Sequence, residues 1–156
     1  MLCAGVLFMS ENVSLRSAAP GDEGAIFALL TSAKLPLDGV HEALGNFFVA
    51  QDAGAVVGVA GLEPCGENAL LRSVAVANSW RGRGLGRALV QRALADASGR
   101  GFSALYLLTT TAESYFPSFG FSTIARDEVP EDIKATREYC GVCPASATVM
   151  MRSLTS

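Results

Sequence analysis

The sequence predicts one α/β domain in which strands surround a central parallel β-α-β unit and helices cover both faces of a mixed sheet. Three observations support this prediction. An apolar run over 69–76 ends at a polar turn, as a buried strand does. Apolar residues then recur at helical spacing, at Val90, Ala93, Leu94 and Ala97. A second apolar run over 104–108 follows, and a crossover helix joins two such strands in parallel.

The elements around this unit follow from alternation, glycine and proline. Before it, we expect a strand over 13–18, a helix over 22–32, a short helical segment at 41–44, strands over 47–50 and 55–62, and a turn over 63–68. After it, we expect a short helix over 112–119, a strand from 121 to 124, a charged loop with a helical turn over 126–138, and a last strand over 145–151.

Three glycines stand at alternate positions between the central strand and its helix, at Gly82, Gly84 and Gly86. Without a Cβ atom they let the backbone approach a ligand closely. The start of the helix leaves N–H groups without intrahelical partners at the positive end of its dipole, and Arg81, Arg83 and Arg87 add charge. Such a junction suits a phosphate or pyrophosphate. It is neither a Walker loop, which needs Lys-Ser or Lys-Thr after the last glycine, nor a Rossmann G-x-G-x-x-G.

Composition excludes several classes of protein. Half of the 156 residues are hydrophobic, 17% are charged, and the formal net charge is −3. This charge argues against general nucleic-acid binding, and no apolar run reaches the ~18 residues of a membrane span. Four cysteines without a secretory signal favour the cytoplasm, and the apolar composition is compatible with a buried homodimer interface. Residues 1–9 are expected to be an appendage, because Met9 is a second potential start.

The string Arg81-Gly82-Arg83-Gly84-Leu85-Gly86 resembles the acyl-CoA loop of the GNAT superfamily of N-acetyltransferases, R/Q-x-x-G-x-G/A, at every fixed position. Phe119-Gly120-Phe121 after a short helix is similar to the family's closing Y-x-x-x-G-F segment. The resemblance covers most of 13–152 and implies the GNAT fold, with a mixed, mostly antiparallel sheet around a parallel β-α-β core. Further pieces, at 70–74, 106–113 and 143–147, resemble the small acetyltransferases found beside arsenic-resistance genes.

The resemblance implies acetyl-CoA as the cosubstrate and assigns its contacts. The amides from Arg81 to Arg87, through Gly82, Arg83, Gly84, Leu85 and Gly86, would hold the pyrophosphate. Val74, Ala75 and Val76 would bind the pantetheine arm, with a backbone N–H polarising the thioester carbonyl. The amine substrate would then attack the thioester directly, with a base to take the ammonium proton and an acid to protonate the thiolate.

The sequence departs from the family at the general acid. The usual tyrosine position, four residues before the glycine of G-F, holds Phe116, which cannot donate a proton. Tyr115 is adjacent but turned by ~100° on a helix, so it is either the acid or a packing residue, and water is the other candidate acid. Glu63, at the end of the strand before the central one, is the candidate base, or else an exposed turn carboxylate.

The substrate is expected to contact Arg72 and Ser73, at a place where family members often carry a carboxylate. A guanidinium holds an anion well, so Arg72 favours an amino acid-like substrate with an acidic group; a surface salt bridge is the alternative. No metal is expected. The pair Cys140 and Cys143 has ligand spacing but no second pair, so these cysteines are taken as structural.

Two functional classes remain open at this point. The first is an acetyl-CoA-dependent N-acetyltransferase acting on a small amine, without nucleic-acid or membrane partners. The second is a non-catalytic acyl-CoA sensor with the same loop, which the phenylalanine at position 116 would suit. Turnover in the presence of an amine separates them.

Overall fold

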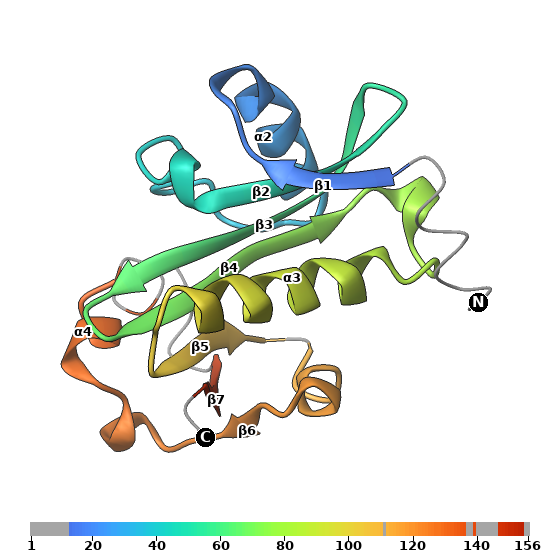
Figure 1. The fold of residues 1–156 in the computed structure, drawn as a ribbon. Helices are drawn as coiled ribbons and strands as arrows, with labels where there is room; N and C mark the ends of the chain where they lie inside the picture. The colour runs from blue at the N-terminus through green and yellow to red at the C-terminus, as the bar shows by residue number, and fades with distance from the viewer. Residues whose placement is uncertain (1–12, 111, 137–138, 140–146, 155–156) are drawn as a thin grey trace. The chain divides into compact units, whose positions relative to one another are not determined.

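The computed structural model describes residues 13–110, 112–136, 139 and 147–154. Within this part of the chain, seven strands form a sheet in the order β1-β2-β3-β4-β5-β7-β6 (Figure 1). The chain divides into two compact units, one with Gly61 and the chain before it plus Ser73–Arg92, the other with Leu62–Arg72 and the chain from Ala93. The prediction of a single domain stays a prediction.

The strands are β1 (Val13–Ser17), β2 (Phe47–Asp52), β3 (Ala55–Cys65), β4 (Asn68–Val76), β5 (Ala104–Thr109), β6 (Ser122–Thr123) and β7 (Thr148–Ser153). The helices are α2 (Glu23–Ser32), α3 (Leu85–Gly99) and α4 (Glu131–Lys134), with 3-10 helices η1 (Pro20–Asp22), η2 (Leu44–Asn46), η3 (Asn78–Trp80), η4 (Phe116–Phe119) and η5 (Arg126–Glu128). Strands β4 and β5 run parallel, whereas β1–β2, β2–β3, β5–β7 and β6–β7 pair antiparallel. The predicted mixed, mostly antiparallel sheet with a parallel core is confirmed.

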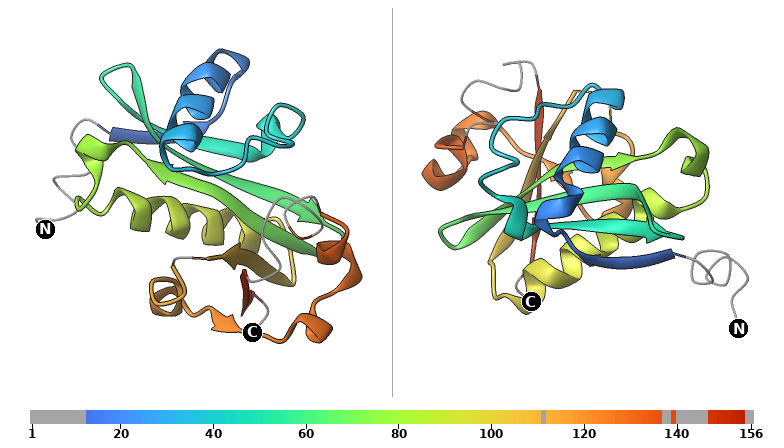
Figure 2. Two further views of the ribbon diagram at one scale, coloured as in Figure 1. Left: turned by 180° about the vertical axis from the view of Figure 1, so that it is seen from behind. Right: turned by 90° about the horizontal axis from the view of Figure 1, so that it is seen from above.

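In the first unit, helices cover both faces of the β2–β3 hairpin. The pair Val49–Val59 lies in one buried cluster with Ile26 and Leu30 of α2. The next pair along, Ala50–Gly58, points the other way, because side chains alternate along strands. A Cβ atom at Gly58 would lie 3.0 Å from Leu89 Cδ1 of α3, so only glycine allows this approach of helix and strand. Figure 2 shows α2 crossing over the β1–β2 part of the sheet in two views.

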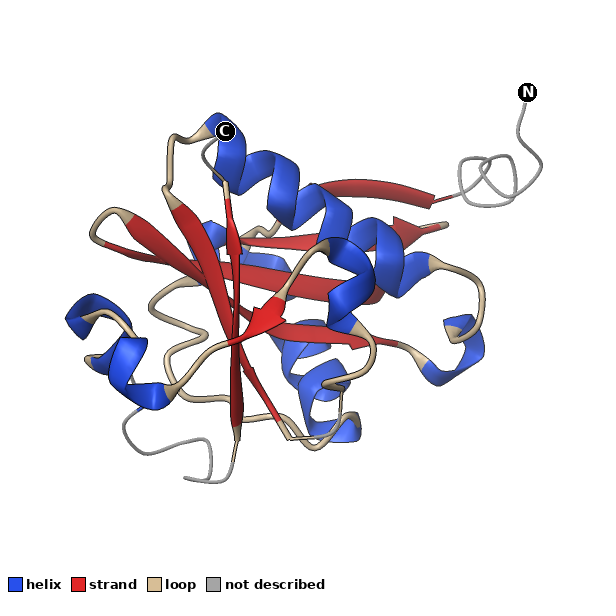
Figure 3. Ribbon diagram, turned by 90° about the horizontal axis from the view of Figure 1, so that it is seen from below, coloured by secondary structure: helices blue, strands red, loops and turns tan. Residues whose placement is uncertain are grey.

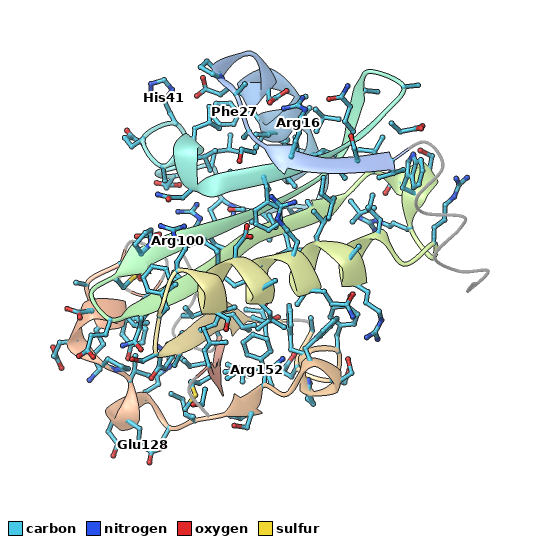
Figure 4. The ribbon with its side chains drawn as sticks, in the orientation of Figure 1. Arg16, Phe27, His41, Arg100, Glu128 and Arg152 are labelled. Atoms are coloured by element: carbon cyan, nitrogen blue, oxygen red, sulfur yellow. The ribbon has the colours of Figure 1, made fainter. Side chains whose placement is uncertain are left out.

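The start of α2 is held by a carboxylate. Asp22 accepts hydrogen bonds from the Ala19 backbone N–H at 2.7 Å and from both terminal nitrogens of Arg16 at 2.8 and 2.9 Å. The hydrogen bond from Arg16, and then that from Ala19, lowers the pKa of Asp22. His41 Nδ1 lies 2.6 Å from Glu23 Oε2 and joins the turns before η2 to the same helix (Figure 4).

The second unit has its own apolar cluster on one face of β4, β5 and β7. Its buried members are Cys65, Leu70, Ala104, Tyr106, Val129, Ile133 and Val149. Strand β7 pairs with β5 over six residues, and the two-residue β6 lies beside β7, the strand that leads to the C-terminus (Figure 3). Arg152 of β7, labelled in Figure 4, donates to the Phe119 carbonyl at 2.7 Å and so ties η4 to the sheet.

The predicted turn over 63–68 is wrong at its start, because β3 continues through Glu63 to Cys65. The turn is predicted from the breakers in this segment, which include Pro64. The registered pairs between β2 and β3 end at Phe47–Gly61, so Pro64 lies beyond them and its missing N–H costs no bond in that ladder. Glu63 is therefore a strand residue and not a turn carboxylate.

The predicted helix over 112–119 is also wrong in its first half. Turns precede η4, which is a 3-10 helix, because Pro117 has no N–H to continue an α-helical ladder. Gly120 ends it at φ +89°. The segment at 41–44 is a turn followed by η2, and the last strand runs over 148–153 rather than 145–151.

The expected appendage at 1–9 lies outside the described residues. Among the described residues, no helix is both long enough and apolar enough to cross a membrane.

Candidate functional site

The glycine loop leads from η3 into α3 with an open backbone. Gly82 and Gly84 adopt φ values of +78° and +83°, which side-chain-bearing residues avoid. A Cβ atom built at either glycine would have no neighbour within 4 Å, so this side of the loop is free of other protein atoms in the described residues. Helix α3 begins at Leu85, and the N–H of Ala88 donates to the Gly84 carbonyl. The amides of the first turn before Ala88 therefore lack acceptors within the helix.

Three arginines surround these amides. Arg81, Arg83 and Arg87 are all exposed. The guanidinium carbon of Arg83 lies 4.7 Å from the ring centroid of Trp80 in a cation–π contact that limits its freedom. Outward-facing amides at a helix start, two glycines with positive φ and a cluster of cations are the donor set that a pyrophosphate requires. The residues of the loop thus fit the diphosphate of an acyl-CoA.

Strand β4 carries an irregularity just before the expected pantetheine contacts. Ser73 is 9% exposed and has φ +61°, a conformation that costs a residue with a side chain about 1–3 kcal/mol. After it, Ala75 is buried in the cluster with Ile26, whereas Val74 and Val76 are half-buried. Observed strain of this kind is typical of functional positions rather than of regular strands.

In the second unit the parallel ladder between β4 and β5 is short. Two pairs are registered, Ala69–Leu105 and Leu70–Tyr106. From Leu71 onward, no registered partner on β5 is found among the described residues, although β5 continues to Thr109. The two strands therefore part at the level of Arg72.

Arg72 and Glu63 form a polar pair at this point. Arg72 Nη1 lies 3.5 Å from Glu63 Oε1, and the two side chains are 2% and 27% exposed. Burying a guanidinium costs free energy unless charges and hydrogen bonds compensate it. Because the Arg72 side chain is buried, its contact with Glu63 is not a surface salt bridge. The sequence named these residues separately, as base and anion holder, and the structure brings them together.

Tyr115, the residue before η4, and Phe116, the first residue of η4, differ in exposure. Tyr115 is 38% exposed and Phe116 is 8% exposed. The Tyr115 ring makes edge contacts with Phe116 and Phe119, at centroid distances of 5.3 and 5.2 Å. The tyrosine thus faces away from the buried side on which the phenylalanine packs, as the expected rotation implies.

The cysteines are the remaining candidates for chemistry at a functional site. Burial, and then the charges of Glu63 and Asp132, raises the pKa of Cys65 to about 12, so this thiol is protonated at neutral pH. Its Sγ donates to the Glu63 carbonyl at 3.2 Å. Within the described part of the chain, no group of three His, Cys, Asp or Glu residues could hold a metal ion. Cys3, Cys140 and Cys143 lie outside the described residues.

One polar residue was missed by sequence reasoning. Tyr106 lies in the apolar run that predicts β5, so its ring was counted with the core. Only the register with β4 places it beside Leu70, two residues before Arg72.

Comparison with known proteins identifies the family. A model of the acetyltransferase (GNAT) domain matches residues 43–123, which include the glycine loop, β4 and η4. The chain belongs to the GNAT acetyltransferases. It is accordingly an acyl-transferring enzyme, and acetyl-CoA is its cosubstrate.

The relatives of this acetyltransferase include proteins of two kinds. It is 31% identical over 112 residues to an uncharacterized N-acetyltransferase of Chlorobaculum tepidum, covering 71% of this chain and 70% of that one. It is 33% identical over 131 residues to the amino-acid acetyltransferase of Neisseria meningitidis serogroup B, covering 76% of this chain and 29% of that one. The chain thus spans less than a third of that longer relative.

A solved structure shares the fold. The N-acetylglutamate synthase from Neisseria gonorrhoeae, complexed with coenzyme A and N-acetyl-glutamate, superposes with a TM-score of 0.81. The match is 24% identical and covers 92% of this chain and 35% of that one. At this identity the likeness shows the fold alone.

Proposed function

We propose that this acetyltransferase transfers the acetyl group of acetyl-CoA to the amino group of an amino acid that carries a further acidic group. The observation that carries the proposal is the pair formed by the buried guanidinium of Arg72 and the partly exposed carboxylate of Glu63. Two opposite charges 3.5 Å apart complement the two charges of a zwitterion. A polyamine would bring only cations to this pair.

In this proposal, residues of the first unit bind the cosubstrate acetyl-CoA. The pyrophosphate would be held by the loop residues Arg81, Gly82, Arg83, Gly84, Leu85, Gly86 and Arg87. The pantetheine arm would be bound by Val74, Ala75 and Val76. The open side of Gly82 and Gly84 and the exposed arginines support this placement. Acetyl-CoA supplies the acetyl group as an activated thioester.

In this proposal, residues of the second unit bind the acceptor amino acid, and Ser73 follows Arg72 on β4. Arg72 would hold a carboxylate of the amino acid through a charge-assisted hydrogen bond, which is worth about 1.5–3 kcal/mol. Glu63 would then face the ammonium group and accept its proton, directly or through one water. Binding of the substrate carboxylate to Arg72 would release Glu63 from its contact with the guanidinium and leave it free to act as the base.

The proton for the leaving thiolate comes from Tyr115 or from water. Tyr115 is exposed enough to exchange protons with solvent, whereas Phe116 at the usual position has none to give. A sensor without turnover would need neither group, but the relatives and the family are acetyltransferases.

The relatives support an amino acid as acceptor. The Neisseria meningitidis protein is named an amino-acid acetyltransferase. The association with arsenic resistance, a cytoplasmic location, a homodimer and the absence of nucleic-acid and membrane partners remain predictions.

The test is release of free CoA by the purified chain with acetyl-CoA and a panel of amines. The panel contains acidic and neutral amino acids, spermidine and an aminoglycoside, and thermal shifts of each with and without acetyl-CoA report binding. We expect an acidic amino acid to give the highest kcat/KM. A preference for spermidine over every amino acid would overturn the proposed acceptor class, and binding without CoA release would favour the sensor.

A further inference from the structure

Tyr106 is a buried tyrosine whose hydroxyl group has no protein partner in the described residues. The residue is 6% exposed and packs in the cluster with Leu70, Ile133 and Val149. No hydrogen bond or ring contact of Tyr106 is found across residues 13–110, 112–136, 139 and 147–154. Buried hydroxyl groups are almost always hydrogen-bonded, because leaving one unpaired costs free energy. The hydroxyl is therefore a candidate for contact with a bound ligand.

The sheet register places this tyrosine next to the polar pair. Tyr106 is the β5 partner of Leu70, and both belong to the same buried cluster and so to the same face. Arg72 follows Leu70 by two residues, which returns it to that face. Arg72 lies about 6.8 Å further along β4 than Leu70, the partner of Tyr106, which is a separation that two long side chains can span. The registered β4–β5 ladder ends at the pair Leu70–Tyr106, and β4 and β5 part beyond it.

The chemistry of this hydroxyl is that of a donor. Burial raises the pKa of Tyr106, so it remains protonated throughout the neutral range. A protonated phenol that has no acceptor among the described residues can donate to an anionic oxygen, and Arg72 is a group on the same face that can hold such an anion. The two together form a mixed site, one cation and one neutral donor, which is typical of carboxylate recognition.

We propose that the Tyr106 hydroxyl donates a hydrogen bond to the carboxylate of the acceptor that Arg72 holds, and so selects amino acids over other amines. This inference rests on the proposed function. It adds a specificity-determining contact from β5 to a site otherwise built from β3 and β4. It also gives a partner to a hydroxyl group that has none among the described residues.

The test is Tyr106→Phe, which removes only the hydroxyl, with Tyr139→Phe as the matched control from the same cluster. The probes are the acidic amino acid of the panel with the highest kcat/KM and its two monoamides, each with one carboxylate replaced. We expect Tyr106→Phe to lower kcat/KM for the acid by about ten- to a hundredfold, through KM, as for loss of a charged hydrogen bond. For the monoamide that lacks the contacted carboxylate, the loss is at least fivefold smaller, since a neutral acceptor binds the donor less strongly. Tyr139→Phe leaves all three substrates unchanged.

Stability separates a ligand contact from a structural one. Because the hydroxyl has no protein partner, Tyr106→Phe should melt no lower than the parent. A clear drop in Tm would reveal a protein partner and overturn the inference. So would unchanged kinetics with the acid, or an equal loss for the acid and both monoamides. A parent enzyme that acetylates only amines without a carboxylate would overturn this inference and the proposed function together, whereas the other outcomes leave the proposed function intact.

Discussion

We propose that the glycine loop from Arg81 to Arg87 and the Glu63–Arg72 pair each hold an anion, and the two regions would do so in opposite ways. The loop offers backbone amides and exposed arginines, and a Cβ atom at Gly82 or Gly84 would have no described protein atom within 4 Å. The pair uses a guanidinium that is 2% exposed and already in contact with a carboxylate. The loop therefore suits a large, multiply charged ligand that stays near solvent, and the pair suits a small one.

The two regions also differ in how strongly they depend on the identity of individual side chains. In the loop, any side chain with the right charge could accompany the three glycines, because the amides carry the contacts. In the pair, the identities of two side chains from two strands carry the contacts, so a single change removes the site. Variants of the pair should alter the acceptor and leave acetyl-CoA alone, and variants of the loop should do the reverse.

The largest effect is expected for Glu63→Gln. If Glu63 is the base, kcat should fall by about 10²–10⁴-fold, as for loss of a general base. KM for an acidic amino acid should not rise, because Arg72 loses a competing carboxylate. Steady-state kinetics with saturating acetyl-CoA measure both values. A raised KM with unchanged kcat would show that Glu63 binds substrate without acting as the base.

The next effect is expected for Gly84→Asp. The substitution places a side chain at φ +83° and a negative charge where phosphate would bind. Strain of about 1–2 kcal/mol together with charge repulsion should weaken acetyl-CoA binding at least about a hundredfold. Calorimetry measures the affinity. Gly24→Asp, at an open position in the first turn of α2, is the control and should bind as the parent does. Parental affinity of Gly84→Asp would remove the loop from the acetyl-CoA site.

The smallest effect is expected for Tyr115→Phe. With phenylalanine already at position 116 and Tyr115 exposed, water can protonate the thiolate, so turnover should fall less than about tenfold. Single-turnover rates at several pH values measure it. A full loss of turnover in a variant that folds and binds acetyl-CoA would make Tyr115 the general acid.

The sequence predicted the loop well because its determinants are local. Gly82, Gly84 and the start of α3 lie within a few residues, and each works through backbone geometry that the residue type sets. The parallel β4–β5 pairing followed from the same segment. Pattern and motif were sufficient there.

The contact between Glu63 and Arg72 could not be predicted from local patterns and motifs. Glu63 was placed in a turn because Pro64 looked like a breaker, and only the end of the β2–β3 ladder shows why a proline fits there. Contact between Glu63 and Arg72 depends on how β3 and β4 align. Tyr106 reaches the same face through a pairing with Leu70, thirty-six residues earlier. Such contacts between strands leave no trace in spacing along the chain.

The most direct test of the account is the ratio of kcat/KM for an acidic amino acid to that for spermidine, in the parent and in Arg72→Gln. We expect the parent to favour the amino acid, and Arg72→Gln to reduce the ratio by about ten- to a hundredfold, the loss of one charged hydrogen bond. Its affinity for acetyl-CoA should be unaltered. Arg100→Gln, which removes an exposed arginine next to Phe102 (Figure 4), is the matched control and should keep the parental ratio. A ratio unchanged in Arg72→Gln would contradict the proposal that this buried guanidinium selects the substrate.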